Sequence, residues 1–380
     1  MTATHMTALD LLDALVRIDS VNPGLDLAGA GEAQIAAWIA RWGRNAGLRV
    51  DVLEGTTGRP SVIVRGGRDR DRGRRLLLCG HLDTVGLAGT PDGLTPRVEG
   101  DRLYARGAYD MKAGLAAALI ACRDATLARI DGEVIVAAVA DEELASLGIA
   151  EVLTHIDPAG IDAAVVTEPT ERQAGTAHRG FVWTEITVTG VAAHGSRPHL
   201  GADAILAAGH HLVALDHLDR QLRSRPHPFL GPGNLHASLI SGGTGESTIP
   251  DRCVFTIERR TLPGETVEHV EADIAQLIEQ CRPADPRMTV TARTVLQRPP
   301  MQTASDAPIV QALLAAAGPG TSVAPMSYWA DSAFLAQAGI PTVLYGPEGD
   351  GAHADIEWVS RSGTTTAATV LTRLAQDFCS

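Results

Sequence analysis

The sequence has no run of about 18 apolar residues, which a membrane-spanning helix needs, and no basic start followed by an apolar segment. We therefore expect neither a membrane span nor a signal peptide. A CxxC motif is also missing, and the five cysteines are widely spaced. An odd number of scattered cysteines does not suggest a disulfide framework, so a reducing cytoplasm is the expected location.

The sequence has fewer basic than acidic residues, and its formal net charge is -13 at pH 7. This balance argues against nucleic acid or another polyanion as a partner. The hydrophobic fraction of 45% and the charged fraction of 20% are ordinary for a globular protein. A length of 380 residues suggests two domains, or one domain with an insertion, at about 100–200 residues per domain.

Short apolar segments alternate with helical patterns along the first part of the chain. Buried strands are expected at residues 76–79, 134–139 and 163–166, and helices at residues 31–46, 111–129 and 144–153. The same alternation of strand and helix patterns returns after Pro300, with a helix expected at residues 307–317 and a strand at residues 342–345. This alternation favours a mostly parallel sheet with helices on both faces.

The pattern changes between these two parts of the chain. Residues 182–189 alternate as a strand does, and the order that follows is helix, strand, strand, helix, strand. This order fits a small α+β domain with one antiparallel sheet and two helices. We therefore predict an α/β fold in which a main domain of residues 1–177 and 296–380 is interrupted by an inserted domain of residues 178–295.

Histidine or acidic residues follow each of the expected parallel strands. They are His81 and Asp83, Glu142 and Glu143, Glu168, and His353, while Asp110 precedes the helix at residues 111–129. In open α/β sheets, ligands bind outside the carboxyl ends of the strands, so these groups are expected to meet at one edge. Burying them together without a cation is costly. Imidazole and carboxylate without thiolate favour zinc or another borderline divalent metal.

Five motifs carry a resemblance to a known family. They are GHLDTV at residues 80–85, YARGAYDMKAG at 104–114, DEE at 141–143, TEPT at 167–170 and GAH at 351–353. In this order and spacing, the sequence resembles the metallopeptidase and deacylase family that includes acetylornithine deacetylase, succinyl-diaminopimelate desuccinylase, aminoacylase and glutamate carboxypeptidase. The resemblance extends from the first helix to the end of the chain.

The resemblance implies a centre with two divalent metal ions, for which Zn²⁺ is favoured and Co²⁺ is the alternative. Asp110 would bridge the two ions. His81 and Glu168 would complete one site, while Glu143 and His353 would complete the other. Such a pair of ions lowers the pKa of a shared water and polarises the carbonyl that the water attacks.

Two further acidic residues have roles that the resemblance implies. Asp83 would hydrogen-bond the other ring nitrogen of His81 and fix its tautomer. Glu142 would act as the general base, taking the proton of the water and passing it to the leaving nitrogen. The site would then hydrolyse an amide bond.

By the same resemblance, the inserted domain is a lid and dimerisation domain. His194 would stabilise the oxyanion, in the family usually from the partner subunit of a homodimer, and a local turn-forming role is the alternative. Arg260 matches the arginine that binds the substrate carboxylate, while the register leaves Arg259 open. A guanidinium fork suits a carboxylate because it can donate two parallel hydrogen bonds.

A glycine-rich loop at residues 241–247 is a further candidate for substrate binding. The backbone at Gly243 could bind an oxyanion, and a flexible loop without a ligand is the alternative. Ser247 stands where many relatives of the family carry an asparagine that contacts the substrate. We therefore expect the substrate pocket to differ from theirs.

These observations predict an enzyme that hydrolyses an N-acyl amino acid or a short peptide with a free carboxylate, and a deacylase like acetylornithine deacetylase is favoured. A carboxypeptidase or dipeptidase of the same family would use the same chemistry. A non-catalytic relative that senses an amino acid derivative would lack a ligand or the base, and none is missing. A two-metal phosphoesterase would need phosphate-binding cations beside the metals, where only Arg106 and Lys112 flank Asp110.

Overall fold

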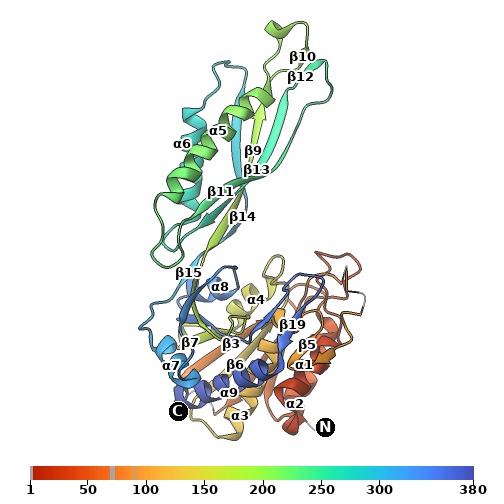
Figure 1. The fold of residues 1–380 in the computed structure, drawn as a ribbon, viewed down its shortest axis with the longest axis vertical. Helices are drawn as coiled ribbons and strands as arrows, with labels where there is room; N and C mark the ends of the chain where they lie inside the picture. Colours follow the sequence, from red (N-terminus) through yellow and green to blue (C-terminus); the bar gives the residue numbers. More distant parts are fainter. Residues whose placement is uncertain (1–2, 69–72, 88, 91) are drawn as a thin grey trace. The chain divides into compact units, whose positions relative to one another are not determined.

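The chain divides into two compact units in a computed structural model that describes residues 3–68, 73–87, 89–90 and 92–380 (Figure 1). The first unit consists of Met1–Thr176, Gln302–Met326 and Ala330–Ser380, and the second of Ala177–Met301 and Ser327–Trp329. The segment predicted as an inserted domain, residues 178–295, lies within the second unit. The short segment at residues 327–329 also belongs to the second unit, which no sequence pattern indicated.

A large sheet forms the centre of the first unit. In the described residues its nine strands are β1 (Arg49–Leu53), β2 (Ser61–Gly67), β3 (Arg75–His81), β6 (Glu133–Val139), β7 (Ala163–Val166), β8 (Ala174–His178), β15 (Met301–Gln302), β16 (Val323–Met326) and β17 (Thr342–Leu344). The order is β1-β2-β6-β3-β7-β17-β8-β15, with β16 beside β8. The neighbours β6, β3, β7 and β17 run parallel to one another, whereas β1, β2 and β8 pair antiparallel.

The four parallel strands are buried from end to end. Their sequences are nearly continuous apolar runs, as expected for parallel strands that are covered on both faces. Leu78 lies beside Val136 on one side and Val165 on the other, and Val165 lies beside Val343. The carboxyl ends of the four strands therefore meet at one edge of the sheet, where His81 ends β3.

Helices cover both faces of this sheet, as the sequence predicted. On one face, five helices share a core with Leu76 and Leu78 of β3, and on the other face two short helices contact each other (Figure 1). The first group is α1 (Ala8–Val16), α2 (Ala33–Asn45), α3 (Ala113–Leu127), α7 (Pro308–Ala317) and α9 (Arg361–Phe378), and the second is α4 (Leu147–His155) and α8 (Ser332–Gln337). The predicted fold class is confirmed.

The helix predicted at residues 111–129 begins later than the pattern indicated. It is preceded by a π-helical turn, η2 (Ala108–Lys112), and α3 itself starts at Ala113. Asp110 (φ -114°, ψ 94°) and Met111 (φ -131°, ψ 31°) have non-helical dihedral angles, and the peptide bond between them is cis. This irregular turn precedes a helix whose first eleven residues are all buried, so it presents Asp110 from a rigid support.

The helix predicted at residues 144–153 also begins later, at Leu147. The reason is a turn in which the carbonyl oxygen of Asp141 accepts the backbone N–H of Ala145 and Ser146. The described chain also has short 3₁₀ segments, which are η1 (Ala3–His5), η3 (Pro158–Gly160) and η4 (Pro198–Leu200). No helix in the described ranges is long and apolar enough to cross a bilayer.

The second unit has one antiparallel sheet and two long helices. The strand order is β11 (Asn234–Gly242), β13 (Arg252–Thr261), β9 (Gly180–Thr189) and β14 (Thr289–Arg298), and the helices are α5 (Ala204–Arg223) and α6 (Val267–Gln280). Ile186, Phe255 and Ile274 belong to the core that joins sheet and helices. A ribbon of β10 (Ala193–His194) and β12 (Thr248–Ile249) lies at one end of this unit (Figure 1).

A small sheet in the first unit joins segments that are far apart in the sequence. Its strands are β18 (Gly349–Asp350), β19 (Trp358–Ser360), β5 (Arg102–Tyr104) and β4 (Arg97–Glu99), in that order. Trp358 pairs with Tyr104 across the two central strands. This sheet therefore brings the segment before Asp110 beside the loop that contains His353.

Candidate metal centre

Asp110 lies between two imidazoles. Its Oδ1 is 3.1 Å from Nε2 of His81, and its Oδ2 is 3.3 Å from Nε2 of His353. His81 is the last residue of β3, and His353 lies in the loop between β18 and β19. Each carboxylate oxygen therefore faces one imidazole, which is the arrangement that a bridging ligand of two metal ions requires.

Two glutamates lie against these imidazoles. Oε2 of Glu143 is 2.9 Å from Nε2 of His353, and Oε1 of Glu168 is 3.9 Å from Nε2 of His81. Glu143 follows β6, and Glu168 follows β7. The structure thus brings the five predicted metal ligands together at the carboxyl edge of the parallel strands.

Glu142 belongs to the same cluster. Ligand atoms of His81, Glu142 and Glu168 lie within 4.8 Å of one another, and this set could hold one ion. The same limit holds for ligand atoms of His81, Asp110 and Glu143. Distances alone therefore do not separate a ligand from a general base in this pair of adjacent glutamates.

The donor set fits divalent cations. Among the described residues, no lysine or arginine forms an ion pair with the four carboxylates Asp110, Glu142, Glu143 and Glu168. Burial raises the pKa of Glu142 and of Glu168 well above the usual range, and neighbouring carboxylates add to this effect although His81 opposes it. Buried carboxylates without a cation are destabilised in this way, so bound metal ions would stabilise the cluster.

The excess of negative charge in the cluster also raises the pKa values of the two imidazoles, His81 and His353. Hydrogen bonds to Asp110 and Glu143 raise the pKa of His353 to about 10, although burial opposes this. Burial alone would lower the pKa of His81, but its bond to Asp110 and the nearby carboxylates raise it well above the usual range. A ligating imidazole is neutral, so a metal ion would replace the proton that the carboxylates stabilise here.

Asp83 contacts His81 in a way that the sequence did not predict. Nδ1 of His81 is 2.9 Å from the main-chain oxygen of Asp83, whereas the nearest carboxylate oxygen is 3.6 Å away. The carboxylate instead accepts the backbone N–H of Glu142 at 3.1 Å and of Glu143 at 3.2 Å. The hydrogen bond to a carbonyl places a proton on Nδ1 and leaves Nε2 to face Asp110, so the tautomer is fixed by the backbone of Asp83.

A buried polar network lies behind the two glutamates. Arg59 donates two hydrogen bonds of 2.6 Å to Glu32 and one of 2.8 Å to Asp141. The amide of Asn22 donates to Asp83 at 2.7 Å and to Asp141 at 2.9 Å. Sequence reasoning missed Arg59, Glu32 and Asn22, because these three residues lie in separate segments outside the motifs that contain Asp83 and Asp141.

Two glycines hold the segment that carries Glu168. A Cβ atom on Gly114, at the start of α3, would overlap the carbonyl oxygen of Thr167. A Cβ atom on Gly346, after β17, would overlap the carbonyl oxygen of Glu168. The absence of side chains at these two positions lets the neighbouring backbones approach from both sides.

His194 and Ser247 lie in neighbouring segments of the second unit, and Gly243 begins the loop that leads to Ser247. Nδ1 of His194 accepts the backbone N–H of Ser196 at 3.1 Å. This is the local turn contact that was the alternative to a catalytic role, and it places the proton of the neutral ring on Nε2. The carbonyl oxygen of Ser247 accepts the N–H of Gly195 at 2.8 Å, and Gly243 adopts a φ of 80° in the turn after β11.

Arg259 and Arg260 have different surroundings at the end of β13. Arg259 is buried and forms ion pairs with Asp273 at 2.5 Å and with Glu265. Arg260 lines a pocket of about 430 Å³ in the second unit, together with Arg179, Asn234 and residues 327–329. Of the two, Arg260 is therefore the arginine that a ligand can reach.

A parallel α/β sheet with imidazoles and carboxylates at its carboxyl edge is typical of metal-dependent hydrolases. A family model described as peptidase family M20/M25/M40 matches residues 77–377, and the chain belongs to this family. The chain is 31% identical to the acetylornithine deacetylase of Myxococcus xanthus over 328 residues, which cover 84% of this chain and 83% of that relative. It is 27% identical to the acetylornithine deacetylase of Edwardsiella ictaluri over 389 residues, covering 97% of each chain.

Solved structures share the fold at lower identity. The aminopeptidase PepT from Bacillus cereus has a TM-score of 0.77 with 18% identity, covering 98% of both chains. The YXEP protein of Bacillus subtilis, described as a dinuclear metal binding peptidase of the M20 family, has a TM-score of 0.74 with 18% identity and the same coverage. The resemblance predicted from the motifs is confirmed, and the chain is a hydrolase that acts on amide bonds.

Proposed function

We propose that this chain is a two-metal amide hydrolase that removes the N-acyl group from an amino acid, in the manner of acetylornithine deacetylase. The observation that carries the proposal is the position of Asp110, whose two carboxylate oxygens face His81 and His353 at 3.1 and 3.3 Å. The acetylornithine deacetylases among the relatives support the hypothesis of a deacylase.

The proposed ligands are those of the sequence prediction. Asp110 would bridge, His81 and Glu168 would bind one ion, and Glu143 and His353 would bind the other. Bound metal ions, Zn²⁺ in the first place or Co²⁺, would lower the pKa of a water and polarise the scissile carbonyl. The cluster holds no cysteine, which fits a borderline rather than a soft metal.

Glu142 is proposed as the general base. It lies among the ligand groups, and its backbone N–H is held by the carboxylate of Asp83 at 3.1 Å. From this position its carboxylate can take a proton from water and pass it to the leaving nitrogen. Asp83 would act as a positioning residue for Glu142 and for the ring of His81.

Arg260 is proposed to bind the carboxylate of the substrate, because it lines a pocket and is half-buried with one acidic partner, Glu258 at 2.6 Å, whereas Arg259 is buried between two acidic partners. A guanidinium can hold a carboxylate through two parallel hydrogen bonds. Gly243 and Ser247 are proposed as further substrate contacts. They lie in the loop beside His194 and are exposed.

His194 is proposed to stabilise the oxyanion in the active site of a second copy of the chain. In one second unit, His194 is at the end of the sheet where β13 begins, and Arg260 is near the other end of β13. At roughly 3.3 Å per residue, that strand separates the two ends by about 25 Å. A small substrate cannot touch both residues of the same unit, so we infer a homodimer.

The surface of the second unit supports a homodimer. β11 is an edge strand of its sheet, and an exposed edge can pair with another chain. Exposed apolar side chains gather on β11 and on the adjoining helix α5, namely Leu239, Ile240, Ile205, Leu206 and Val213. An isologous interface across this edge would cover them.

The proposed partners are otherwise small molecules, an N-acyl amino acid or a short peptide, with no nucleic acid and no membrane. A cytoplasmic location is also proposed. It is supported by the five cysteines, which lie in described segments and are all free thiols.

A metal-dependent carboxypeptidase or dipeptidase is the second candidate, since it would use the same cluster on a peptide bond. A non-catalytic binding relative is the third. Metal analysis of the purified protein, paired with hydrolysis of N-acetyl, N-succinyl and N-formyl amino acids and of dipeptides, separates the three. About two divalent ions per chain and chelator-sensitive deacylation support the proposal. Hydrolysis of dipeptides alone favours the peptidase, and folded protein without turnover on any substrate favours the binding relative.

A further inference from the structure

Glu357 is a buried carboxylate that no motif of the sequence singled out. It is 4% exposed and lies just before β19. Its Oε1 accepts the backbone N–H of Tyr109 at 2.8 Å and of Asp110 at 3.0 Å. Its Oε2 accepts the backbone N–H of Gly107 and a guanidinium nitrogen of Arg106, both at 2.9 Å. Glu357 therefore holds the irregular turn that presents the proposed bridging ligand.

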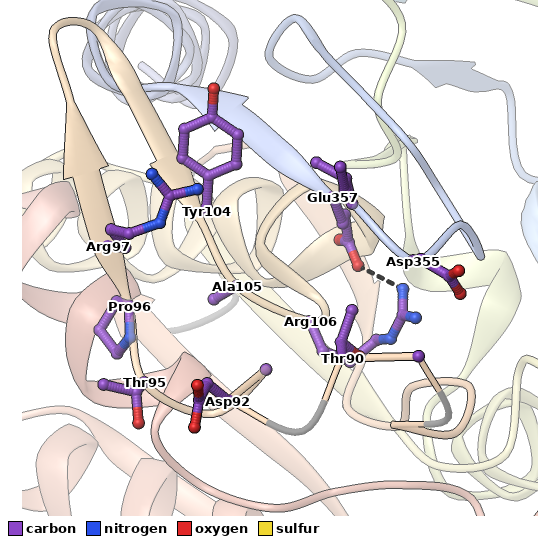
Figure 2. A pocket seen from close by; sticks show the side chains of 13 residues that line it. Thr90, Asp92, Thr95, Pro96, Arg97, Tyr104, Ala105, Arg106, Asp355 and Glu357 are labelled. Carbon is purple, nitrogen blue, oxygen red and sulfur yellow. Dashed lines mark hydrogen bonds and ion pairs between the residues drawn. The ribbon is translucent and has the colours of Figure 1, made fainter.

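Arg106 connects this turn to the loop that carries His353. The guanidinium is 3% exposed, and besides Glu357 it donates to the carbonyl oxygen of Ala354 at 2.9 Å and of Gly86 at 3.1 Å. Ala354 directly follows His353. Figure 2 shows Arg106 and Glu357 facing each other from the two chain segments. One buried ion pair thus touches the backbone beside two of the proposed ligands.

The loop that carries His353 is mostly exposed to solvent. Residues 352–356 are exposed, and Ile356 is 68% exposed. A cavity of about 650 Å³ borders the loop and is lined by Asp355, Ile356 and the Arg106–Glu357 pair (Figure 2). Polar contacts therefore fix this segment more than apolar packing does, and besides those of His353 with Asp110 and Glu143 they include the hydrogen bond from Arg106 to the backbone of Ala354.

We propose that the Arg106–Glu357 ion pair positions Asp110 and His353 relative to each other, and thereby sets the affinity of the metal site that these residues form with Glu143. The inference rests on the proposed metal centre. Groups that orient metal ligands typically contribute a factor of about 10–100 to metal affinity. Arg106 and Glu357 are positioning residues, since neither would contact the ion or the substrate.

Glu357→Gln is the direct test. A glutamine keeps the shape of the side chain. Its amide NH₂ would replace one carboxylate oxygen and would therefore face N–H donors where Glu357 has an acceptor. Glu133→Gln is the matched control, because Glu133 is 3% exposed and forms a buried ion pair with Arg75 at 2.9 Å. Glu133 begins β6, at the opposite end of the strand from the metal cluster. Both variants remove one buried carboxylate charge in the same unit, and Glu133→Gln also loses the pairs of Glu133 with Arg49 at 2.8 Å and Arg65 at 4.0 Å.

Metal-free protein is titrated with Co²⁺, and binding is measured by calorimetry and by the visible absorption of the bound ion. We expect two binding steps in the parent protein, and His353→Ala should lose one of them. Glu357→Gln should weaken that same step about 10–100-fold. Glu133→Gln should keep both affinities, whatever its effect on thermal stability.

Two results would overturn the inference while leaving the metal centre in place. They are unchanged Co²⁺ affinity in Glu357→Gln, and equal weakening in Glu133→Gln. A parent protein that binds no Co²⁺ would instead overturn the metal centre and the inference with it. If Glu357→Gln does not fold, Arg106→Lys replaces it, because lysine keeps the charge but cannot reach Glu357 and Ala354 together, and the same step should weaken.

Discussion

Arg59 donates a hydrogen bond of 2.8 Å from Nη2 to Asp141, while Nε and the same Nη2 donate to Glu32. Asp141 has a φ of 66°, a left-handed value that is uncommon outside glycine. Because Asp141 directly precedes Glu142 and Glu143, this ion pair stabilises the turn from which both glutamates reach the cluster.

Replacing Arg59 by methionine should destabilise the protein by about 3–5 kcal/mol, because it leaves two buried carboxylates without their cation. Turnover should fall as well, since the turn at Asp141 loses its support. Chemical denaturation and steady-state kinetics measure the two effects. Arg17→Met is the control, because Arg17 is 52% exposed and pairs with Asp13 at the surface, so its loss should change stability little. Equal effects of the two substitutions would contradict this account.

The two adjacent glutamates should separate in function. Glu142→Gln should abolish turnover while both metal ions stay bound, because a base is lost and a ligand is not. Glu143→Gln should lose one metal ion or bind it more weakly, because a carboxylate ligand is replaced by a neutral amide. Elemental analysis of bound metal, together with activity measurements on each variant, tests both expectations. Metal loss in Glu142→Gln would show that Glu142 is a ligand, which the 4.8 Å cluster with His81 and Glu168 would also permit.

The parts of the fold that the sequence could predict depend on local patterns. The apolar runs of β3, β6 and β7 indicated buried parallel strands, and parallel strands place their carboxyl ends at one edge. This argument alone brought His81, Glu143 and Glu168 together. The motif that contains Asp110 was visible too, but its non-helical turn was not, because a helical pattern continues through it.

The supports of the site could not be predicted in the same way. Arg106 was considered only as a flanking cation, and Glu357 was not considered, because their pairing depends on a contact between segments about 250 positions apart. Arg59, Glu32 and Asn22 come from three loops whose meeting depends on the whole sheet. Charged side chains in loops are usually solvated, so the sequence offered no signal that these would be buried.

Mixing two inactive variants tests whether His194 acts across a dimer. If it does, a mixed dimer of His194→Ala and Glu142→Ala subunits contains one complete active site, whereas a site built within one subunit is never complete. We therefore expect an equal mixture of subunits, exchanged by reversible dissociation, to regain about a quarter of parent activity. Sedimentation checks that dimers form. Dimers without any recovery would place His194 in its own subunit or outside catalysis.

His178 should make stability depend on pH. It is buried at the end of β8, and burial lowers its pKa to about 4 although its hydrogen bond to the carbonyl of Arg179 opposes this. In the unfolded chain its pKa is about 6.5. Between these values the unfolded state binds the proton and the folded state does not, so stability is full above pH 6.5 and falls as pH decreases toward 4, by roughly 3 kcal/mol in all.

Denaturant unfolding of metal-free protein at pH 7 and pH 4 measures this loss. His178→Gln cannot be protonated, so its stability should fall less over the same interval, by the share that His178 contributes. His199→Gln is the control, because it replaces an exposed histidine by the same residue and leaves the buried His178 in place. If His178→Gln lost as much stability on acidification as the parent protein, the acid sensitivity would belong to other groups, and burial of a neutral His178 would not be its cause.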